Sequence, residues 1–174
     1  AGRLESAAAA LRSQGHDVRT AAFDVTNEDE VESGIARIEA EIAPVDILVN
    51  NAGMQHRTPF AEFPTDAWHR ITTTNVDSVF LVGRAVARRM IERRAGKIIN
   101  ICSVQSELGR PGIAPYAATK GAVKMLTKGM AIDWGPHGLQ VNGLGPGYFK
   151  TELNQALVDN PEFSQWLINR TPSR

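Results

Sequence analysis

Short apolar runs alternate along the chain with longer segments in which apolar residues recur every three or four positions. The short runs predict β-strands at 16–25, 45–50, 97–104 and 139–144. The longer, periodic segments predict helices at 3–14, 26–43, 65–94 and 114–134, and a shorter helix-like stretch at 152–158. Helices and strands therefore alternate along most of the chain.

Helix-capping and helix-breaking residues separate these segments. Thr26 is the expected N-cap of the second helix, and Asp29 lies three residues further on, close to the position of a capping box. Pro44 is expected to end that helix, and Gly96 is expected to end the long helix that follows. Local signals and periodicity thus agree on where the elements lie.

Near-continuous apolar strands separated by helices are typical of a parallel sheet that is covered on both faces. Right-handed crossover connections then give an α/β fold with a doubly wound parallel sheet. Ligands of such sheets bind beyond the carboxyl ends of the strands. Asp24, Asn51, Ser103 and Pro146 lie at or just after those ends, so we expect the functional site there.

The composition limits the classes of protein to which the chain can belong. Its 174 residues suffice for one domain, and its 19 basic and 19 acidic residues balance. A nucleic-acid or membrane partner bound by electrostatics would need a basic excess, so neither is expected. The four histidines and the single cysteine show no ligand spacing, which predicts no metal site, and one cysteine suits a reducing, cytoplasmic compartment.

Tyr116 and Lys120 lie four residues apart on a predicted helix and therefore share one face. A free phenol has a pKa of about 10, and a neighbouring ammonium favours the phenolate, which lowers that pKa. The pair is thus a workable proton donor. Ser103, at the end of a strand, is placed to hold a carbonyl oxygen, and Asn75 is placed to hold a water that supplies protons to Lys120.

Each of these residues also has a purely structural interpretation. A Tyr-x-x-x-Lys pair arises by chance in roughly one chain in three of this length. Ser103 alone would be a serine that caps a loop, and Asn75 alone would be an exposed or locally hydrogen-bonded side chain. The functional interpretation rests on the combination of these residues.

The candidate residues form part of a longer series of motifs, in a fixed order. The series is Asn50-Asn51-Ala52-Gly53, Asn75, Ser103, Tyr116, Lys120 and Pro146-Gly147. It resembles the motif series of the short-chain dehydrogenase/reductase family and covers nearly the whole chain. The resemblance implies a Rossmann-like fold and an enzyme that transfers a hydride between NADP or NAD and a secondary alcohol or ketone.

The resemblance also implies roles for individual residues. Tyr116 would be the general acid/base and Ser103 would orient the substrate oxygen. Lys120 would bind the nicotinamide ribose and tune Tyr116, and Asn75 would complete a proton relay. The implied cofactor contacts run from the adenine end to the nicotinamide end, at Asp24, Val25, Asn51, Ala52, Gly53, Tyr116, Lys120, Pro146, Gly147, Phe149 and Thr151.

Residues 98–153 and 51–59 resemble the gluconate 5-dehydrogenases within this family, which implies oxidation of D-gluconate to 5-keto-D-gluconate and the reverse. Such a sugar acid needs several hydrogen-bond partners and a cation for its carboxylate. The expected substrate contacts are Ser103, Tyr116, Gln105 and Arg57, with Arg110 and Lys150 as further candidates for the carboxylate. Any one of these basic side chains can instead be a solvated surface charge.

Other activities stay open at this point. A 3-oxoacyl carrier-protein reductase or another short-chain alcohol reductase is the alternative within the same class. A non-catalytic nucleotide-binding or assembly subunit is the alternative outside it. Apolar residues on the two long helices predict a homo-oligomer, either a dimer or a tetramer: Val79, Val86, Met125, Leu126 and Met130.

The chain is expected to form a single dinucleotide-binding and catalytic domain over residues 1–174. It is expected to lack the family's first strand, Gly-rich loop and helix, together with its last strand. Two explanations are open. Either the sequence is part of a longer chain, which we favour, or the product is truncated and its cofactor affinity is lost.

Overall fold

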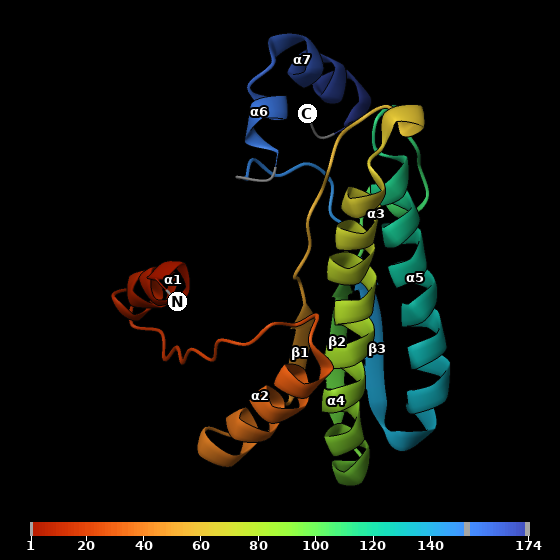
Figure 1. Ribbon diagram of the computed structural model, residues 1–174. Coiled ribbons are helices and arrows are strands. Elements are labelled where there is room, and N and C mark those ends of the chain that lie inside the picture. Colours follow the sequence, from red (N-terminus) through yellow and green to blue (C-terminus); the bar gives the residue numbers. More distant parts are fainter. Residues whose placement is uncertain (1, 152–153, 173–174) are drawn as a thin grey trace.

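The computed structural model describes residues 2–151 and 154–172 and has a parallel β-sheet at its centre (Figure 1). The sheet contains three strands in the order β1 (Ile47–Asn50), β2 (Gly96–Ile101) and β3 (Leu139–Leu144). All neighbouring strands run parallel, with Ile98 opposite Leu48 on one side and opposite Val141 on the other. The predicted α/β class with a parallel sheet is therefore confirmed, and its carboxyl edge lies at Asn50, Ile101 and Leu144.

Helices α4 (Ser78–Arg93) and α5 (Ala114–Trp134) connect these strands and cover one face of the sheet. Ile98 on that face is fully buried, whereas Ile47 and Val49 on the opposite face are 57% and 52% exposed. Coverage of both faces was expected, but the described residues cover only one. The reason is geometric, because crossovers of one hand between successive neighbouring strands place their helices on the same side.

A single helix was predicted over 65–94, and the structure divides it into three parts. Helix α3 (Thr65–Thr72) passes through a π-helical turn, η2 (Thr73–Asp77), into α4. The end of α4 also differs from the prediction, because Arg94 takes the left-handed conformation (φ 54°) and Gly96 instead begins β2. A side chain at Gly96 would overlap Met90, so close packing explains this glycine.

The first part of the chain corrects two predictions. Helix α1 (Gly2–Arg12) forms as expected and is drawn apart from the sheet in Figure 1, but residues 16–24 pair with no described strand. Apolar alternation is not sufficient for a strand, which needs a neighbour for its backbone groups. Helix α2 (Glu28–Glu41) is capped by Asn27, whose side chain accepts from Glu30 N, and not by Thr26. Thr26 instead donates to the Asp24 carboxylate.

Short helices complete the fold. Of three 3₁₀ turns, η4 (Gly135–His137) precedes the amino end of β3, whereas η1 (Phe60–Glu62) and η3 (Val104–Ser106) follow the carboxyl ends of β1 and β2. Helices α6 (Gln155–Val158) and α7 (Pro161–Arg170) lie above those ends in Figure 1. The helix predicted at 152–158 is thus found over 155–158, and its first two residues lie outside the described part. Among the described helices, none is both long and apolar enough to cross a membrane.

The apolar core lies between α2, α4, α5 and the sheet. It contains Val79, Val86 and Met130, which are 3%, 0% and 7% exposed within this one chain. Their apolar character is therefore explained without a second subunit, which corrects the choice of residues for an oligomer contact. Met125 is different, because it is 61% exposed on α5.

Candidate active site

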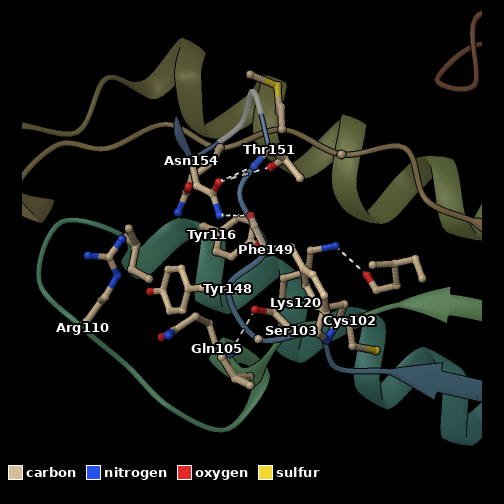
Figure 2. Close-up of a pocket in the computed structure, with 18 of the residues that line it drawn as sticks. Cys102, Ser103, Gln105, Arg110, Tyr116, Lys120, Tyr148, Phe149, Thr151 and Asn154 are labelled. Atoms are coloured by element: carbon tan, nitrogen blue, oxygen red, sulfur yellow. Dashed lines mark hydrogen bonds between the residues drawn. The ribbon is translucent and has the colours of Figure 1, made fainter. Parts of the chain in front are cut away.

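A cavity of about 470 Å³ opens beyond the carboxyl ends of β2 and β3 (Figure 2). Its walls come from the loop after β1, the end of β2 with η3, the first turns of α5, and the loop after β3. Most of the predicted site residues line it, namely Asn51, Gly53, Arg57, Ser103, Gln105, Tyr116, Lys120, Pro146, Gly147, Phe149 and Thr151. Segments up to a hundred residues apart in the sequence thus meet at one place.

The π-helical turn positions Asn75 behind this cavity. Asn75 is 1% exposed, and its Oδ1 accepts from Met54 N at 2.8 Å. Its Nδ2 donates to Met54 O at 3.0 Å and to Thr119 Oγ1 at 3.1 Å. Both amide hydrogens are therefore engaged, and the side chain joins the loop after β1 to α5. A water bound to this amide, as expected from the sequence, would have only Oδ1 as its partner.

Ser103 is the second residue after the end of β2, and it caps the 3₁₀ turn η3. Its Oγ accepts from Gln105 N at 3.1 Å, and its backbone N donates to Ser106 Oγ at 3.2 Å. One lone pair of the Ser103 hydroxyl is used in this way, and its own hydrogen remains for a group in the cavity. A carbonyl oxygen needs such a hydrogen-bond donor.

Tyr116 and Lys120 lie one helical turn apart on α5, as predicted, and both face the cavity. Lys120 is 6% exposed, and its Nζ donates to Ile101 O at 2.6 Å and lies 5.9 Å from the centre of the Tyr116 ring. Burial lowers the pKa of the Lys120 ammonium, and the ionised form of the neighbouring Cys102 thiol would act against this. The strand end thus holds the amine at the base of the cavity.

Burial raises the pKa of the Tyr116 phenol above its ordinary value. Hydrogen bonding with Ser103 acts in the opposite direction, Tyr148 raises the pKa further, and the positive charge of Arg57 lowers it. The ammonium of Lys120 was expected to favour the phenolate, and this stays a prediction. In this structure hydrogen bonding with Ser103 and the charge of Arg57 are the influences that lower the pKa of the phenol.

The predicted cofactor residues fall into two groups. Those of the nicotinamide end share the main cavity, whereas Val25, Asn51 and Ala52 line a second, smaller cavity of about 90 Å³. Asn51 belongs to both, so the two spaces adjoin. Asp24 lines neither cavity, and its carboxylate accepts from the backbone N and the hydroxyl of Thr26.

The predicted carboxylate-binding cations do not behave alike. Arg57 and Arg110 line the cavity. Burial lowers the pKa of Arg57, and repulsion by the positive charge of Arg110 lowers it further. Lys150 does not line the cavity, and its Nζ pairs with Asp159 at 2.7 Å. Figure 2 shows Arg110 on the same side of the cavity as Tyr148 and Gln105.

Several lining residues were not predicted from the sequence. Tyr148 lies between two predicted residues of the loop after β3, and Asn154 holds that loop by accepting from Thr151 N at 3.0 Å and donating to Phe149 O at 2.8 Å. Phe163 of α7 reaches back, with its ring 5.4 Å from the Arg110 guanidinium and 5.5 Å from the Tyr148 ring. The aromatic residues that follow Gly147 were the available signal.

Comparisons with known proteins agree on the family. The family described as short chain dehydrogenase matches residues 1–162. A gluconate 5-dehydrogenase of Gluconobacter oxydans (strain 621H) is 59% identical over 170 residues, which are 98% of this chain and 66% of that protein. A 5-keto-D-gluconate 5-reductase of Escherichia coli (strain K12) is 53% identical over 171 residues, covering 98% of this chain and 67% of that protein.

Solved structures show the same relationship. A crystal structure of a gluconate 5-dehydrogenase from Burkholderia cenocepacia J2315, in complex with NADP and tartrate, superposes with a TM-score of 0.92 at 57% identity. The match covers 96% of this chain and 66% of that one. The chain therefore spans about two thirds of the length of these relatives.

Proposed function

Because this chain belongs to the short-chain dehydrogenase family, we propose that it transfers a hydride between NADP or NAD and a secondary alcohol or ketone. We further propose that the substrate pair is D-gluconate and 5-keto-D-gluconate, on which relatives of 59% and 53% identity act according to their names. The observation that supports this proposal is the presence of Ser103, Tyr116 and Lys120 in one cavity with two arginines.

The residues of the chain divide the proton chemistry between them. In the oxidative direction Tyr116 accepts the hydroxyl proton of the substrate, and in the reductive direction it returns that proton to the carbonyl oxygen. Ser103 donates its free hydrogen to the same oxygen and holds it beside the phenol. A nicotinamide ring, when bound, supplies or accepts the hydride.

The cavity fits such a cofactor at its nicotinamide end. A Cβ on Gly53 would lie 3.4 Å from Asn75 Oδ1 and 3.9 Å from Lys120 Nζ, so a side chain there would fill the space in front of the amine. Gly147 faces open space on the other wall. Lys120 and Asn51 are the residues proposed to bind the ribose, with Thr151 and the loop after β3 at the ring.

Arg57 and Arg110 support an acidic substrate. Two guanidinium groups that repel one another at one side of a cavity are stabilised by an anion between them. In the described part of the chain neither arginine forms an ion pair with a carboxylate. Gln105, whose buried Oε1 has no hydrogen-bond partner among the described residues, is suited to accept from a substrate hydroxyl on the same side as Arg110.

The proposed assembly is a homo-oligomer. Of the residues that the sequence indicated for its contact, Met125 is kept, and Phe80 and Ile132 are added. Phe80 on α4 and Met125 and Ile132 on α5 are 44%, 61% and 74% exposed. Burial of such side chains by a second copy would remove apolar surface from water. The free Cys102 suits the cytoplasm, where we place the enzyme.

A direct test follows NADPH absorbance with 5-keto-D-gluconate, with an acetoacetyl thioester and with buffer alone. We expect turnover with the sugar acid, and Tyr116→Phe should lower kcat by about 10² to 10⁴-fold while leaving cofactor affinity unchanged. Turnover with the thioester only would indicate a carrier-protein reductase. Cofactor binding without turnover of either would indicate a non-catalytic subunit and refute the proposal.

A further inference from the structure

The hydroxyl of Ser106 connects the two elements that bear the candidate proton-transfer residues. Ser106 ends the 3₁₀ turn η3, which continues from β2 and Ser103. Its Oγ accepts from Ser103 N at 3.2 Å and donates to Lys120 O at 2.9 Å. One side chain thus spans from the backbone of the strand end to the backbone of α5.

The direction of both hydrogen bonds is fixed by the partners. A carbonyl oxygen only accepts, so the single Ser106 hydrogen points to Lys120 O. A backbone N–H only donates, so Ser103 N uses a lone pair of the same oxygen. Because Ser106 is partly buried, water competes weakly for these positions.

We propose that Ser106 is a positioning residue that fixes the distance between the Ser103 hydroxyl and the Tyr116 phenol. This inference rests on the dehydrogenase function proposed above, since it concerns the geometry of that site. Without the Ser106 hydroxyl, the turn η3 would be attached to α5 through the exposed Glu107–Lys124 ion pair and through packing, and the strand end would keep the bond from Lys120 Nζ to Ile101 O. Neither of these polar contacts involves the backbone of Ser103 itself.

The consequence for Tyr116 has a definite sign. Hydrogen bonding with Ser103 lowers the pKa of the phenol, so a looser Ser103 should let that pKa rise. Other groups act on the pKa of the phenol as well, namely Tyr148 and Arg57, and the Lys120 amine lies 5.9 Å from the centre of its ring. None of them contacts the Ser106 side chain by a hydrogen bond, so their effects should be the same with and without its hydroxyl.

The chain offers a direct measurement, because Tyr116 and Tyr148 are its only two tyrosines. In a Tyr148→Phe background, the ultraviolet absorbance of phenolate reports the titration of Tyr116 alone. We would compare Ser106→Thr, which keeps the hydroxyl, with Ser106→Val, because valine has nearly the same shape as threonine and no hydroxyl. Ser106→Val should raise the pKa of Tyr116, and Ser106→Thr should retain it.

Kinetics supply the second measurement, in the protein with Tyr148 intact. If the Ser103 hydroxyl is no longer aligned with the Tyr116 phenol, kcat should fall by about tenfold to a hundredfold in Ser106→Val, with the Kd for NADPH unchanged. The inflection of the oxidative pH profile should move to higher pH. Glu107→Gln is the matched control, since it breaks the other link between η3 and α5 and should change neither the pKa nor kcat.

The outcomes separate this inference from the proposed function. Equal Tyr116 pKa values and equal kcat in the Thr and Val variants would overturn the role of Ser106, even if the enzyme reduces 5-keto-D-gluconate. A raised pKa in the Val variant of a protein without such turnover would support the positioning role and refute the activity. If Ser106→Val and Ser106→Ala both fail to fold while Ser106→Thr folds, the hydroxyl serves folding, and the positioning role is overturned.

Discussion

A buried chain of polar side chains crosses the core beneath the candidate site, and Thr127 is the residue at which it is best tested. Asn50 Nδ2 donates to Asn100 Oδ1 at 2.9 Å, and Asn100 Nδ2 donates to Thr127 Oγ1 at 2.9 Å. Asn100 is fully buried and Thr127 is 7% exposed. The Thr127 hydroxyl completes the chain by donating to Val123 O at 2.7 Å.

The substitution Thr127→Val keeps the shape of the side chain and removes the hydroxyl. The Asn100 amide then loses its strongest acceptor and retains only the Met130 sulfur, at 3.6 Å. An unsatisfied buried donor costs about 1–3 kcal/mol, and we expect the free energy of unfolding to fall by that amount. For a chain of 174 residues this lowers Tm by about 2–4 °C per kcal/mol.

Urea unfolding followed by circular dichroism measures this effect, with the midpoint shifted and the slope m unchanged. Thr127→Ser is the control, because it keeps the hydroxyl and loses one buried methyl group, worth about 0.8 kcal/mol. The thiol gives a second measurement. The nearby Thr127 hydroxyl opposes the rise that burial causes in the pKa of Cys102, so Thr127→Val should make this thiol react more slowly with alkylating reagents. If the Val variant proves as stable as the wild type, or more stable than the Ser variant, the polar chain does not stabilise the core.

Three further predictions follow from other parts of the structure. Gly138→Ala should lower the free energy of unfolding by about 2 kcal/mol or more, because Gly138 has φ 85° and a Cβ would overlap Arg94 O; an unchanged urea midpoint would contradict this. Glu39→Gln removes the charge that pairs with Arg93 on α4 and should cost about 1 kcal/mol, less at high salt, as a series of melts in rising NaCl would show. Since burial lowers the pKa of Lys120, the unfolded chain binds that proton more tightly, and stability should rise with pH from the lowered pKa up to the ordinary lysine value. Lys120→Met should abolish that rise, and a wild-type pH dependence in the variant would refute the assignment.

Where local signals and packing agreed, the sequence was sufficient to predict an element. The bounds of α5 and β3 match the predicted 114–134 and 139–144, since a buried apolar face and the Gly135-Pro136 break both act there. The segment 16–25 shows the opposite case, because its apolar alternation says nothing about whether a neighbouring strand is present.

The candidate site divides in the same way. Helical spacing alone placed Tyr116 and Lys120 on one face, and the end of a strand placed Ser103 near them. The bond of Lys120 to Ile101 O and the pairing of Lys150 with Asp159 depend on loops and strand ends that meet only in the folded chain. The bridge through Ser106 is of this kind as well, since nothing in the spacing of Ser106 and Lys120 indicates a contact.

The π-helical turn at 73–77 has a consequence for insertions and deletions in this chain. Such a turn holds one residue more than the regular helix, and each residue of a regular helix rotates the chain by about 100°. Removal of a single residue from this turn would therefore swing Asn75 away from Met54 by about a quarter of a circle, or else twist α3 against α4 by the same angle. The number of residues in this irregular turn thus sets the rotation of α3 about the helix axis relative to α4. Insertions and deletions should therefore be far less tolerated here than in the exposed loops of the molecule.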